Sequence, residues 1–229
     1  INTDPLAIIL EPLRRNTAPA IAIAAMKAIN ENKDKNIDPT LLILSSDHYI
    51  KNLDLFKKTI QNSIELASNG NLIIFGIIPS YPATGYGYIK AKNQLRRNSF
   101  VANKVEKFIE KPDLNTAKEL FKDKKYSWNS GMFVCKASSI LRELTKFSPE
   151  IVENCERCLK KSENDLDFLR LDKSSFSKCK DISIDKSVFE KTQKAHVLAL
   201  NCGWDDIGNW ESLWNISKKD RNGNVIKGN

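Results

Sequence analysis

Two segments of the chain carry carboxylates that are suited to holding a divalent cation. Asp47 follows the apolar run Leu41 to Leu44, and Asp206 follows the apolar run Ala195 to Leu200. A carboxylate beside a buried strand is unfavourable unless it caps a helix or faces a cation. Mg²⁺ is usually held by one or two carboxylates, with phosphates and waters completing an octahedron. Asp47 and Asp206 therefore predict a magnesium site, with a helix cap and a turn as the plainer alternatives.

A second set of residues is suited to binding a sugar phosphate. The segment Thr84 to Tyr88 contains two glycines, which let backbone approach a ligand, and two tyrosines, which offer flat faces and hydroxyls. Glu110 can accept from vicinal sugar hydroxyls, and Lys111 can hold a phosphate as a point charge. Asn129, expected just before a strand, offers both donors and acceptors. Taken singly, these segments also fit a turn, an exposed edge strand and core aromatics.

These residues need a scaffold that brings distant segments together. Apolar runs at Leu6 to Leu10, Leu41 to Leu44 and Leu72 to Ile77 alternate with two helical stretches. This β-α-β-α-β order, with nearly continuous apolar strands, predicts an α/β fold with a parallel sheet covered on both faces. Ligands bind beyond the carboxyl ends of such strands. We therefore expect Glu11, Asp47 and the glycine–tyrosine segment to converge on one crevice.

The second half of the chain is less regular. It predicts a hairpin-like excursion, further strands and short helices, with only weak periodicity from 150 to 181. The expected strands are Tyr88 to Lys90, Lys104 to Ile109, Gly131 to Cys135 and Ala195 to Leu200, and the expected helices are Leu114 to Phe121, Ser138 to Phe147, Asp185 to Lys191 and Gly208 to Trp214.

The charge of the chain leaves several partners open. A net charge of +8 with a pI near 9.2 could favour nucleic acid, a membrane surface or phosphorylated ligands. The lysines are scattered, often beside asparagine, which is typical of solvated faces. No nucleic-acid signature is evident, and no apolar run approaches the roughly 18 residues of a membrane span. We therefore expect neither nucleic acid nor a membrane as a partner.

The cysteines favour a reducing compartment. The chain has 5 cysteines, and the segment Ile1 to Leu10 lacks the basic and long apolar regions of a signal peptide. An odd number of cysteines without a signal favours free thiols and a cytoplasmic location. Cys155 and Cys158 form a C-x-x-C pair without a second pair at zinc spacing, so we expect two thiols on one helix face.

The motifs of the chain, in their order, resemble those of bacterial mannose-1-phosphate guanylyltransferases. The similarity runs collinearly over essentially the whole sequence, so chance agreement is negligible. The matching segments are Glu11 to Ala20 (E-P-x-x-R-N-T-A-P-A), Asp47-His48, Phe75 to Ile77, Thr84 to Ile89 (T-G-Y-G-Y-I), Phe108 to Asp113 (F-x-E-K-P-D), Trp128 to Phe133 (W-N-S-G-M-F), Ser183 to Asp185 with Glu190 to Thr192, and Gly203 to Trp210 (G-W-x-D-x-G-x-W).

The resemblance implies a fold and a reaction. The fold would be a Rossmann-like nucleotidyltransferase domain with a mostly parallel mixed sheet, and residues 1–229 would be a partial nucleotide-sugar pyrophosphorylase (glycosyltransferase-A-like) catalytic domain. GTP and mannose 1-phosphate would give GDP-mannose and pyrophosphate, with Mg²⁺. The implied roles are metal binding and catalysis for Asp47 and Asp206, catalysis and phosphate binding for Lys111, nucleotide binding for Glu11, Asn16, Thr17 and Asp47, and sugar binding for Tyr86, Gly87, Glu110 and Asn129.

The chain departs from the family at its start. Members carry a G-G-x-G-T-R-L-x-P-L-S loop that clamps the triphosphate, and these 229 residues do not contain it. We expect a domain that lacks the first β-α unit and exposes an apolar sheet edge. The chain would then be an enzyme completed by an N-terminal segment or chain, or a non-catalytic binding subunit, with self-association as a further outcome. A sister pyrophosphorylase for another sugar or base is a third hypothesis.

Overall fold

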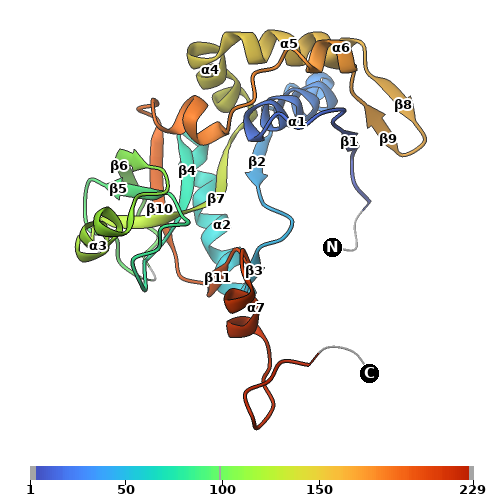
Figure 1. Cartoon of the computed structure of the whole chain (residues 1–229). Coiled ribbons are helices and arrows are strands. Elements are labelled where there is room, and N and C mark those ends of the chain that lie inside the picture. Colours follow the sequence, from blue (N-terminus) through green and yellow to red (C-terminus); the bar gives the residue numbers. More distant parts are fainter. Residues whose placement is uncertain (1–3, 98, 227–229) are drawn as a thin grey trace.

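A six-stranded mixed sheet is the scaffold of the computed structural model, which describes residues 4–97 and 99–226 (Figure 1). Within the described part of this sheet, β4 (Leu72–Ile77) and β10 (Ala195–Leu200) pair in parallel, and the other pairings are antiparallel. In order across the sheet, the strands are β2 (Thr40–Ile43), β7 (Tyr126–Lys136), β4 (Leu72–Ile77), β10 (Ala195–Leu200), β6 (Asn103–Ile109) and β5 (Tyr88–Ala91), and β5 also pairs with β7.

The expected α/β fold with a mixed sheet is confirmed, but the expectation of mostly parallel pairing is wrong. β2 and β4 run in the same direction, as a β-α-β unit requires, since both are antiparallel to β7. β7 lies between them, although it comes from much later in the sequence. β7 also begins five residues earlier than expected, so Trp128 and Asn129 lie within the strand instead of before it.

Helices cover both faces of this sheet. On one face lie α1 (Thr17–Glu31), α4 (Ala137–Phe147) and α5 (Pro149–Lys160), which contact one another, and α2 (Leu53–Ser68) packs against the strands on the other. The residues of β4 alternate between the two hydrophobic clusters, with Leu72 and Ile74 in one and Ile73 and Phe75 in the other. All of β4 is buried, which explains its continuous apolar sequence.

The first predicted strand does not belong to the main sheet. β1 (Ile8–Leu10) pairs in parallel with β9 (Phe168–Arg170), and β8 (Glu163–Asp165) completes a separate three-stranded sheet. The sequence missed β8 and β9 because each has only 3 residues, and β8 is entirely polar.

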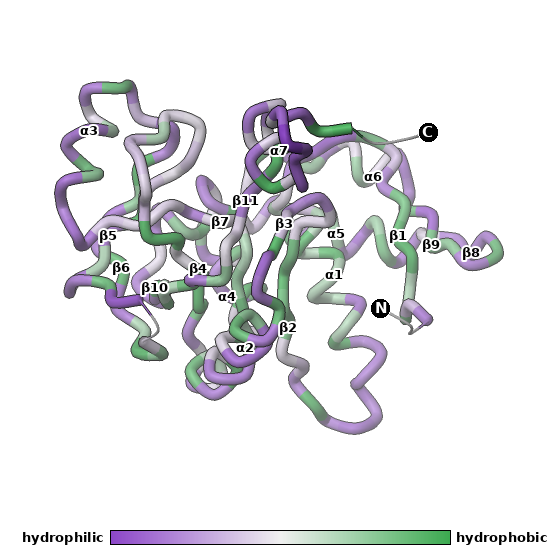
Figure 2. The backbone as a smooth tube through the Cα atoms, turned by 90° about the horizontal axis from the view of Figure 1, so that it is seen from below, coloured by the Kyte–Doolittle hydropathy of each residue, from purple (hydrophilic) through white to green (hydrophobic). Residues whose placement is uncertain are grey.

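The position of β1 leaves β2 at the edge of the main sheet. Among the described residues β2 pairs with β7 only, and the tube is hydrophobic along β2 (Figure 2). Leu42 in β2 and Leu44 just after it are 37% and 47% exposed, so the expected apolar sheet edge is confirmed.

The remaining elements are short and flank the sheet. They are η1 (Lys33–Lys35), β3 (Tyr49–Ile50), α3 (Leu114–Lys122), α6 (Lys173–Phe176), η2 (Asp185–Phe189), β11 (Trp204–Asp205) and α7 (Trp210–Ile216). No helix in the described part of the chain has the length and apolar character that a membrane crossing needs.

Candidate active site

A two-stranded ladder brings the two predicted metal-binding segments together. β3 and β11 pair antiparallel, with Trp204 opposite Ile50 and Asp205 opposite Tyr49. Asp47 lies two residues before β3, and Asp206 directly follows β11, so both aspartates lie at the same end of the ladder. The indole Nε1 of Trp204 donates a hydrogen bond to His48 Nδ1 at 3.1 Å, which ties the two segments together beside the aspartates.

The two adjacent aspartates after β10 have different surroundings. Asp205 Oδ1 accepts from the amide of Ile207 at 2.8 Å, and Ile207 has a φ of 50°, so Asp205 stabilises a tight turn. Asp206 Oδ1 accepts from the amide of Gly208 at 3.1 Å and from the hydroxyl of Tyr86 at 3.0 Å. The plainer turn interpretation therefore describes Asp205, while Asp206 also contacts the glycine–tyrosine segment.

Tyr86 links Asp206 to a group of aromatic side chains. Its ring lies 5.1 Å from the ring of Trp128 and 5.5 Å from that of Trp204, between centroids. Burial, together with the hydrogen bond to the Asp206 carboxylate, raises the pKa of Tyr86 well above its usual value. Tyr86 therefore stays protonated and acts as the donor to Asp206.

Three of the predicted sugar-binding residues come together from distant segments, and we call Gly87, Glu110 and Asn129 the Gly87 group. The amide of Asn129 donates to the carbonyl of Gly87 at 2.7 Å. A Cβ on Gly87 would lie 2.7 Å from Glu110 Oε2 and 3.5 Å from Asn129 Cβ. Gly87 thus marks a close approach of backbone to two polar side chains, and a larger residue would displace the Glu110 carboxylate.

A fourth residue, Asp185 at the start of η2, joins this group, although the sequence gave it no site role. Its Oδ1 accepts from Asn129 Nδ2 at 2.9 Å. Burial raises the pKa of the Asp185 carboxyl to about 6, and the charge of Glu110 adds to this, while the bond from Asn129 opposes it. Asp185 lies in a segment that carries the family resemblance, and that was the only signal available in the sequence.

Lys111, the predicted phosphate ligand, follows Glu110 at an unusual backbone position. Its φ of 40° lies in the left-handed region, which non-glycine residues rarely adopt. The side chain is exposed, and Lys111 takes part in no ion pair among the described residues. Lys111 directly follows Glu110 in the chain, so an exposed lysine adjoins the Gly87 group in sequence.

The predicted nucleotide-binding residues form another group at the start of α1. Asn16 has a φ of 61° and caps the helix, its Oδ1 accepting from the amide of Thr17 at 3.0 Å. Partial burial raises the pKa of the Glu11 carboxyl. An open depression of about 500 Å³ is lined by Glu11, Arg14, Arg15, Asn16, Thr17, Ala20 and Asp181.

Asp47 does not line this depression, so the expected single crevice for Glu11 and Asp47 is not seen. The reason is that β1 pairs with β9, outside the main sheet, so Glu11 does not follow a strand next to β2.

A series of contacts nevertheless connects the three groups. The amide of Ile184 donates to Thr17 Oγ1 at 2.9 Å, and the next residue, Asp185, accepts from Asn129. Asn129 in turn bonds Gly87, whose neighbour Tyr86 bonds Asp206. One residue of each group, namely Thr17, Asn129 and Asp206, is therefore connected to the others through hydrogen bonds and adjacent residues.

Comparison with known proteins places the chain in a family. The model of the family described as nucleotidyl transferase matches residues 4–223. The chain belongs to the nucleotidyl transferase family. This confirms the resemblance seen in the motifs and the expected type of fold.

Several curated members of the nucleotidyl transferase family are similar along most of the chain. Mannose-1-phosphate guanylyltransferase RfbM of Salmonella typhimurium is 49% identical over 227 residues, which cover 98% of this chain and 46% of that protein. Mannose-1-phosphate guanylyltransferase of Escherichia coli K12 is 42% identical over 222 residues, or 96% of this chain and 46% of that protein. The chain thus spans about half the length of the curated relatives that it matches.

Two solved structures are similar in fold to this chain. A structure described as mannose-1-phosphate geranyltransferase from Thermus thermophilus is 30% identical with a TM-score of 0.76, covering 92% of this chain and 58% of that one. One described as mannose-6-phosphate isomerase from Helicobacter pylori is 35% identical with a TM-score of 0.74, covering 86% and 74%.

Proposed function

We propose that the chain carries the sugar-phosphate and metal side of a mannose-1-phosphate guanylyltransferase, which makes GDP-mannose and pyrophosphate from GTP and mannose 1-phosphate. The observation that carries this proposal is the meeting of Gly87, Glu110 and Asn129 next to the Tyr86–Asp206 hydrogen bond. The curated relatives described above, which bear this name, support the choice of sugar and base.

Binding of the sugar would use the Gly87 group. Glu110 and Asn129 offer acceptors and donors to vicinal hydroxyls, and the backbone at Gly87 lets the ring approach closely. Lys111 would hold the phosphate of mannose 1-phosphate as a point charge. The phosphate oxygen would then be directed at the α-phosphorus of GTP for an in-line attack, with pyrophosphate leaving. Such a transfer depends mainly on positioning and on charge neutralisation.

The acidic end of the β3–β11 ladder fits Mg²⁺. Among the described residues there is no cluster of three or more histidine, cysteine or acidic side chains that could hold a metal. A cation here would therefore take its protein ligands from Asp47 and Asp206 alone and the rest from phosphates and water, as Mg²⁺ prefers. Bound Mg²⁺ would supply neutralisation of the phosphate charge. Tyr86 orients Asp206 for this role by occupying Oδ1.

The guanine nucleotide would bind toward the start of α1. Glu11 offers an acceptor for base or ribose donors, and Asn16 and Thr17 lie beside it. Arg14 and Arg15, which line the same depression, add positive charge for an anionic ligand. Partial burial raises the pKa of the Glu11 carboxyl, as expected for an acceptor that is partly withdrawn from water.

As part of the proposal, the edge of β2 is completed by a further strand, from an N-terminal segment, a complementing chain or a second copy. The unpaired edge and the exposure of Leu42 and Leu44 support this. We place the reaction in the cytoplasm, since the 5 cysteines are free thiols.

The test is an assay of pyrophosphate release and GDP-mannose formation with GTP, mannose 1-phosphate and Mg²⁺. It compares the 229-residue chain with a polypeptide in which a family glycine-rich segment precedes it. We expect activity in the extended polypeptide, and binding of mannose 1-phosphate by both. Product from glucose 1-phosphate or another triphosphate, but not from mannose 1-phosphate and GTP, would overturn the assignment. Activity of the shorter chain alone would show that no added segment is needed.

A further inference from the structure

Three buried cysteines cluster where α5 meets the loop between α6 and η2. Cys155 and Cys158 lie on α5, and Cys179 lies in the loop, with exposures of 0%, 0% and 2%. The Sγ atoms of Cys155 and Cys179 are 3.9 Å apart, whereas the Sγ of Cys158 donates to the carbonyl of Asp172 at 3.4 Å. The close pair is therefore Cys155 and Cys179, not the C-x-x-C pair that the sequence singles out.

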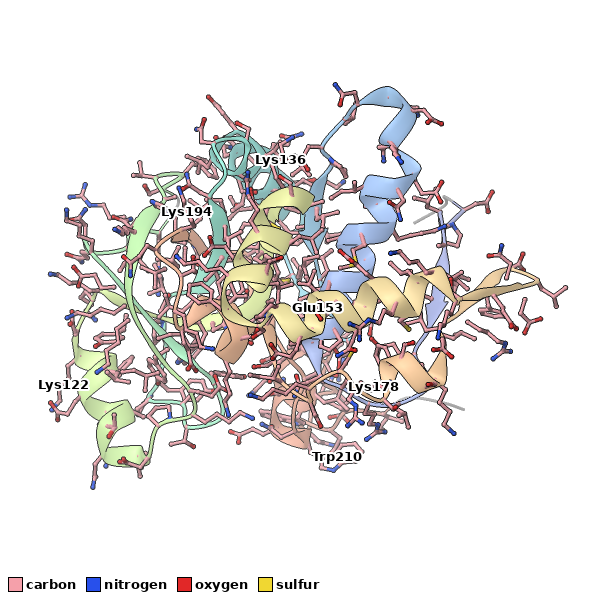
Figure 3. All side chains as sticks on the ribbon, turned by 90° about the horizontal axis from the view of Figure 1, so that it is seen from above. Lys122, Lys136, Glu153, Lys178, Lys194 and Trp210 are labelled. Carbon is pink, nitrogen blue, oxygen red and sulfur yellow. The ribbon has the colours of Figure 1, made fainter. Side chains whose placement is uncertain are left out.

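We propose that Cys155 and Cys179 are a modification site that closes to a disulfide when the protein meets a peroxide. The bond would tie α5 to the segment 177–184. Figure 3 labels Glu153 on α5 and Lys178 in that segment, and both lie on the same side of the molecule. Neither the Gly87 group nor the β3–β11 ladder involves these thiols.

The movement needed is small. A disulfide has a sulfur–sulfur distance of about 2.05 Å, so the two sulfurs approach each other by roughly 2 Å from their present 3.9 Å. Cys155 is held on a regular helix, but Cys179 lies at a bend after α6, outside regular secondary structure. Local opening of this loop would admit a small neutral oxidant and let Cys179 shift.

Cys179 differs from the other thiols in reactivity. The hydrogen bond from Cys155 lowers the pKa of Cys179, and the nearby Arg15 guanidinium lowers it further. Burial raises the pKa of Cys135 to about 12 and that of Cys158 and Cys202 to about 11. Since the thiolate is the nucleophile, Cys179 is the sulfur that reacts first.

The reaction balances with hydrogen peroxide as the oxidant. The Cys179 thiolate attacks one peroxide oxygen, the O–O bond breaks, and the product is a sulfenic acid with release of water after protonation. The Cys155 sulfur then attacks the Cys179 sulfur, its proton leaves with the hydroxyl as a second water, and the disulfide forms. The two thiols lose two electrons in total, and these reduce the peroxide.

The segment 177–184 is hydrogen-bonded to the start of α1. Arg15 Nη2 donates to the carbonyl of Ser177 at 2.7 Å, the amide of Ala18 donates to the carbonyl of Ile182 at 3.2 Å, and Ile184 donates to Thr17 Oγ1. A disulfide at Cys179 would therefore restrain the segment that lies against the Arg15–Ala18 backbone. Its formation is a property of these thiols and does not depend on the proposed function.

The test treats the folded chain with hydrogen peroxide, quenches it, and counts thiols after denaturation. We expect the count to fall by two from the 5 free cysteines, with recovery on adding dithiothreitol. Peptide mapping by mass spectrometry should find the peptide of Cys155 joined to that of Cys179. Cys155→Ser and Cys179→Ala should each abolish the crosslink, whereas Cys158→Ser, a change on the same helix, should retain it.

Circular dichroism of each variant before oxidation shows whether it is folded, and the wild-type peptide map decides the proposal if a variant is not. A crosslink between Cys155 and Cys158, a thiol count that stays at 5, or accumulation of a sulfinic acid at Cys179 without a crosslink would each overturn the proposal.

Discussion

Two glycines in one segment, Gly85 and Gly87, have opposite surroundings. A Cβ on Gly87 would come within 2.7 Å of Glu110 Oε2, whereas a Cβ on Gly85 would meet nothing within 4 Å. We expect Gly87→Ala to displace the Glu110 carboxylate and to lower kcat/KM for mannose 1-phosphate roughly tenfold to a hundredfold, since small misplacements in a site have large effects on rate.

The matched control is Gly85→Ala, which should leave the kinetics unchanged. Because the Glu110 side chain is flexible, the free energy of unfolding should fall by less than about 1 kcal/mol in Gly87→Ala. Steady-state kinetics of the extended polypeptide and urea unfolding of the 229-residue chain measure the two effects. Equal kinetics for the two alanine variants would remove Gly87 from the sugar site.

The buried carboxyl of Asp185 should make stability depend on pH. Its pKa is about 6 in the folded chain against a reference of 3.8, so the folded state binds the proton more tightly than the unfolded state. Below pH 3.8 the Asp185 carboxyl is protonated in both states and does not lower the free energy of unfolding. As the pH rises from 3.8 through about 6, the free energy of unfolding falls. Each unit of difference in pKa corresponds to about 1.4 kcal/mol, so the free energy of unfolding falls by about 3 kcal/mol in all.

Asp185→Asn should remove this dependence, because the amide oxygen still accepts from Asn129 but carries no charge. Urea unfolding of wild type and Asp185→Asn across this pH range measures the difference, which should grow as the pH rises. Asp181→Asn, a change at an exposed aspartate in the preceding loop, is the control. A difference between wild type and Asp185→Asn that does not change with pH would contradict the assignment.

At the scale of elements, the β3–β11 ladder positions the candidate metal ligands. The Trp204–His48 hydrogen bond lies on this ladder, beside both aspartates. Trp204→Phe keeps a ring but removes the Nε1 donor, and bonds that orient metal ligands are typically worth a factor of ten or more in metal affinity. We expect the Mg²⁺ concentration for half-maximal activity to rise roughly tenfold, with kcat at saturating Mg²⁺ little changed.

Trp214→Phe is the matched control, since Trp214 Nε1 donates to the carbonyl of Gly223 away from the ladder. Mg²⁺ titrations of activity compare the two variants. An equal shift in both, or a loss of kcat that Mg²⁺ does not restore in Trp204→Phe, would show that the ladder does not act through the metal.

The sequence predicted which segments form strands more reliably than it predicted which strands pair. The apolar runs of β4 and β10 follow from burial on both faces, and β2, β4 and β10 all form as expected. The insertion of β7 between β2 and β4 was not predictable, because strand pairing over such separations depends on tertiary packing and not on local pattern. The same reason explains the pairing of β1 with β9.

The candidate site shows the same division. The motifs identified Gly87, Glu110 and Asn129, whose mutual contacts the structure brings about. Asp185 received no role, because its burial and its bond from Asn129 arise only when η2 packs against β7. Residue types and motifs thus indicated the chemistry, whereas the hydrogen bonds that connect these residues could be seen only in the folded structure.

At the scale of the whole molecule, β2 is the edge strand of the main sheet among the described residues, and the sheet that contains β1 is separate from it (Figure 1). An unpaired edge with exposed leucines is a template for another strand. Both the proposed addition of a strand and the expected self-association would use the edge of β2. A substitution that blocks one should therefore also affect the other.

We expect the 229-residue chain to self-associate in a concentration-dependent manner through β2. Leu42→Lys places a charge on the edge strand at a position that is 37% exposed, which should shift the protein toward monomer without unfolding it. Ile64→Lys on α2, at a position that is 44% exposed, is the control and should leave the association unchanged. Sedimentation velocity over a wide concentration range measures this, and adding the preceding family segment should reduce association in wild type as strongly as Leu42→Lys does. A wild-type chain that stays monomeric at every concentration would show that the β2 edge does not recruit another copy, because the exposed leucines would then be tolerated in water as they are.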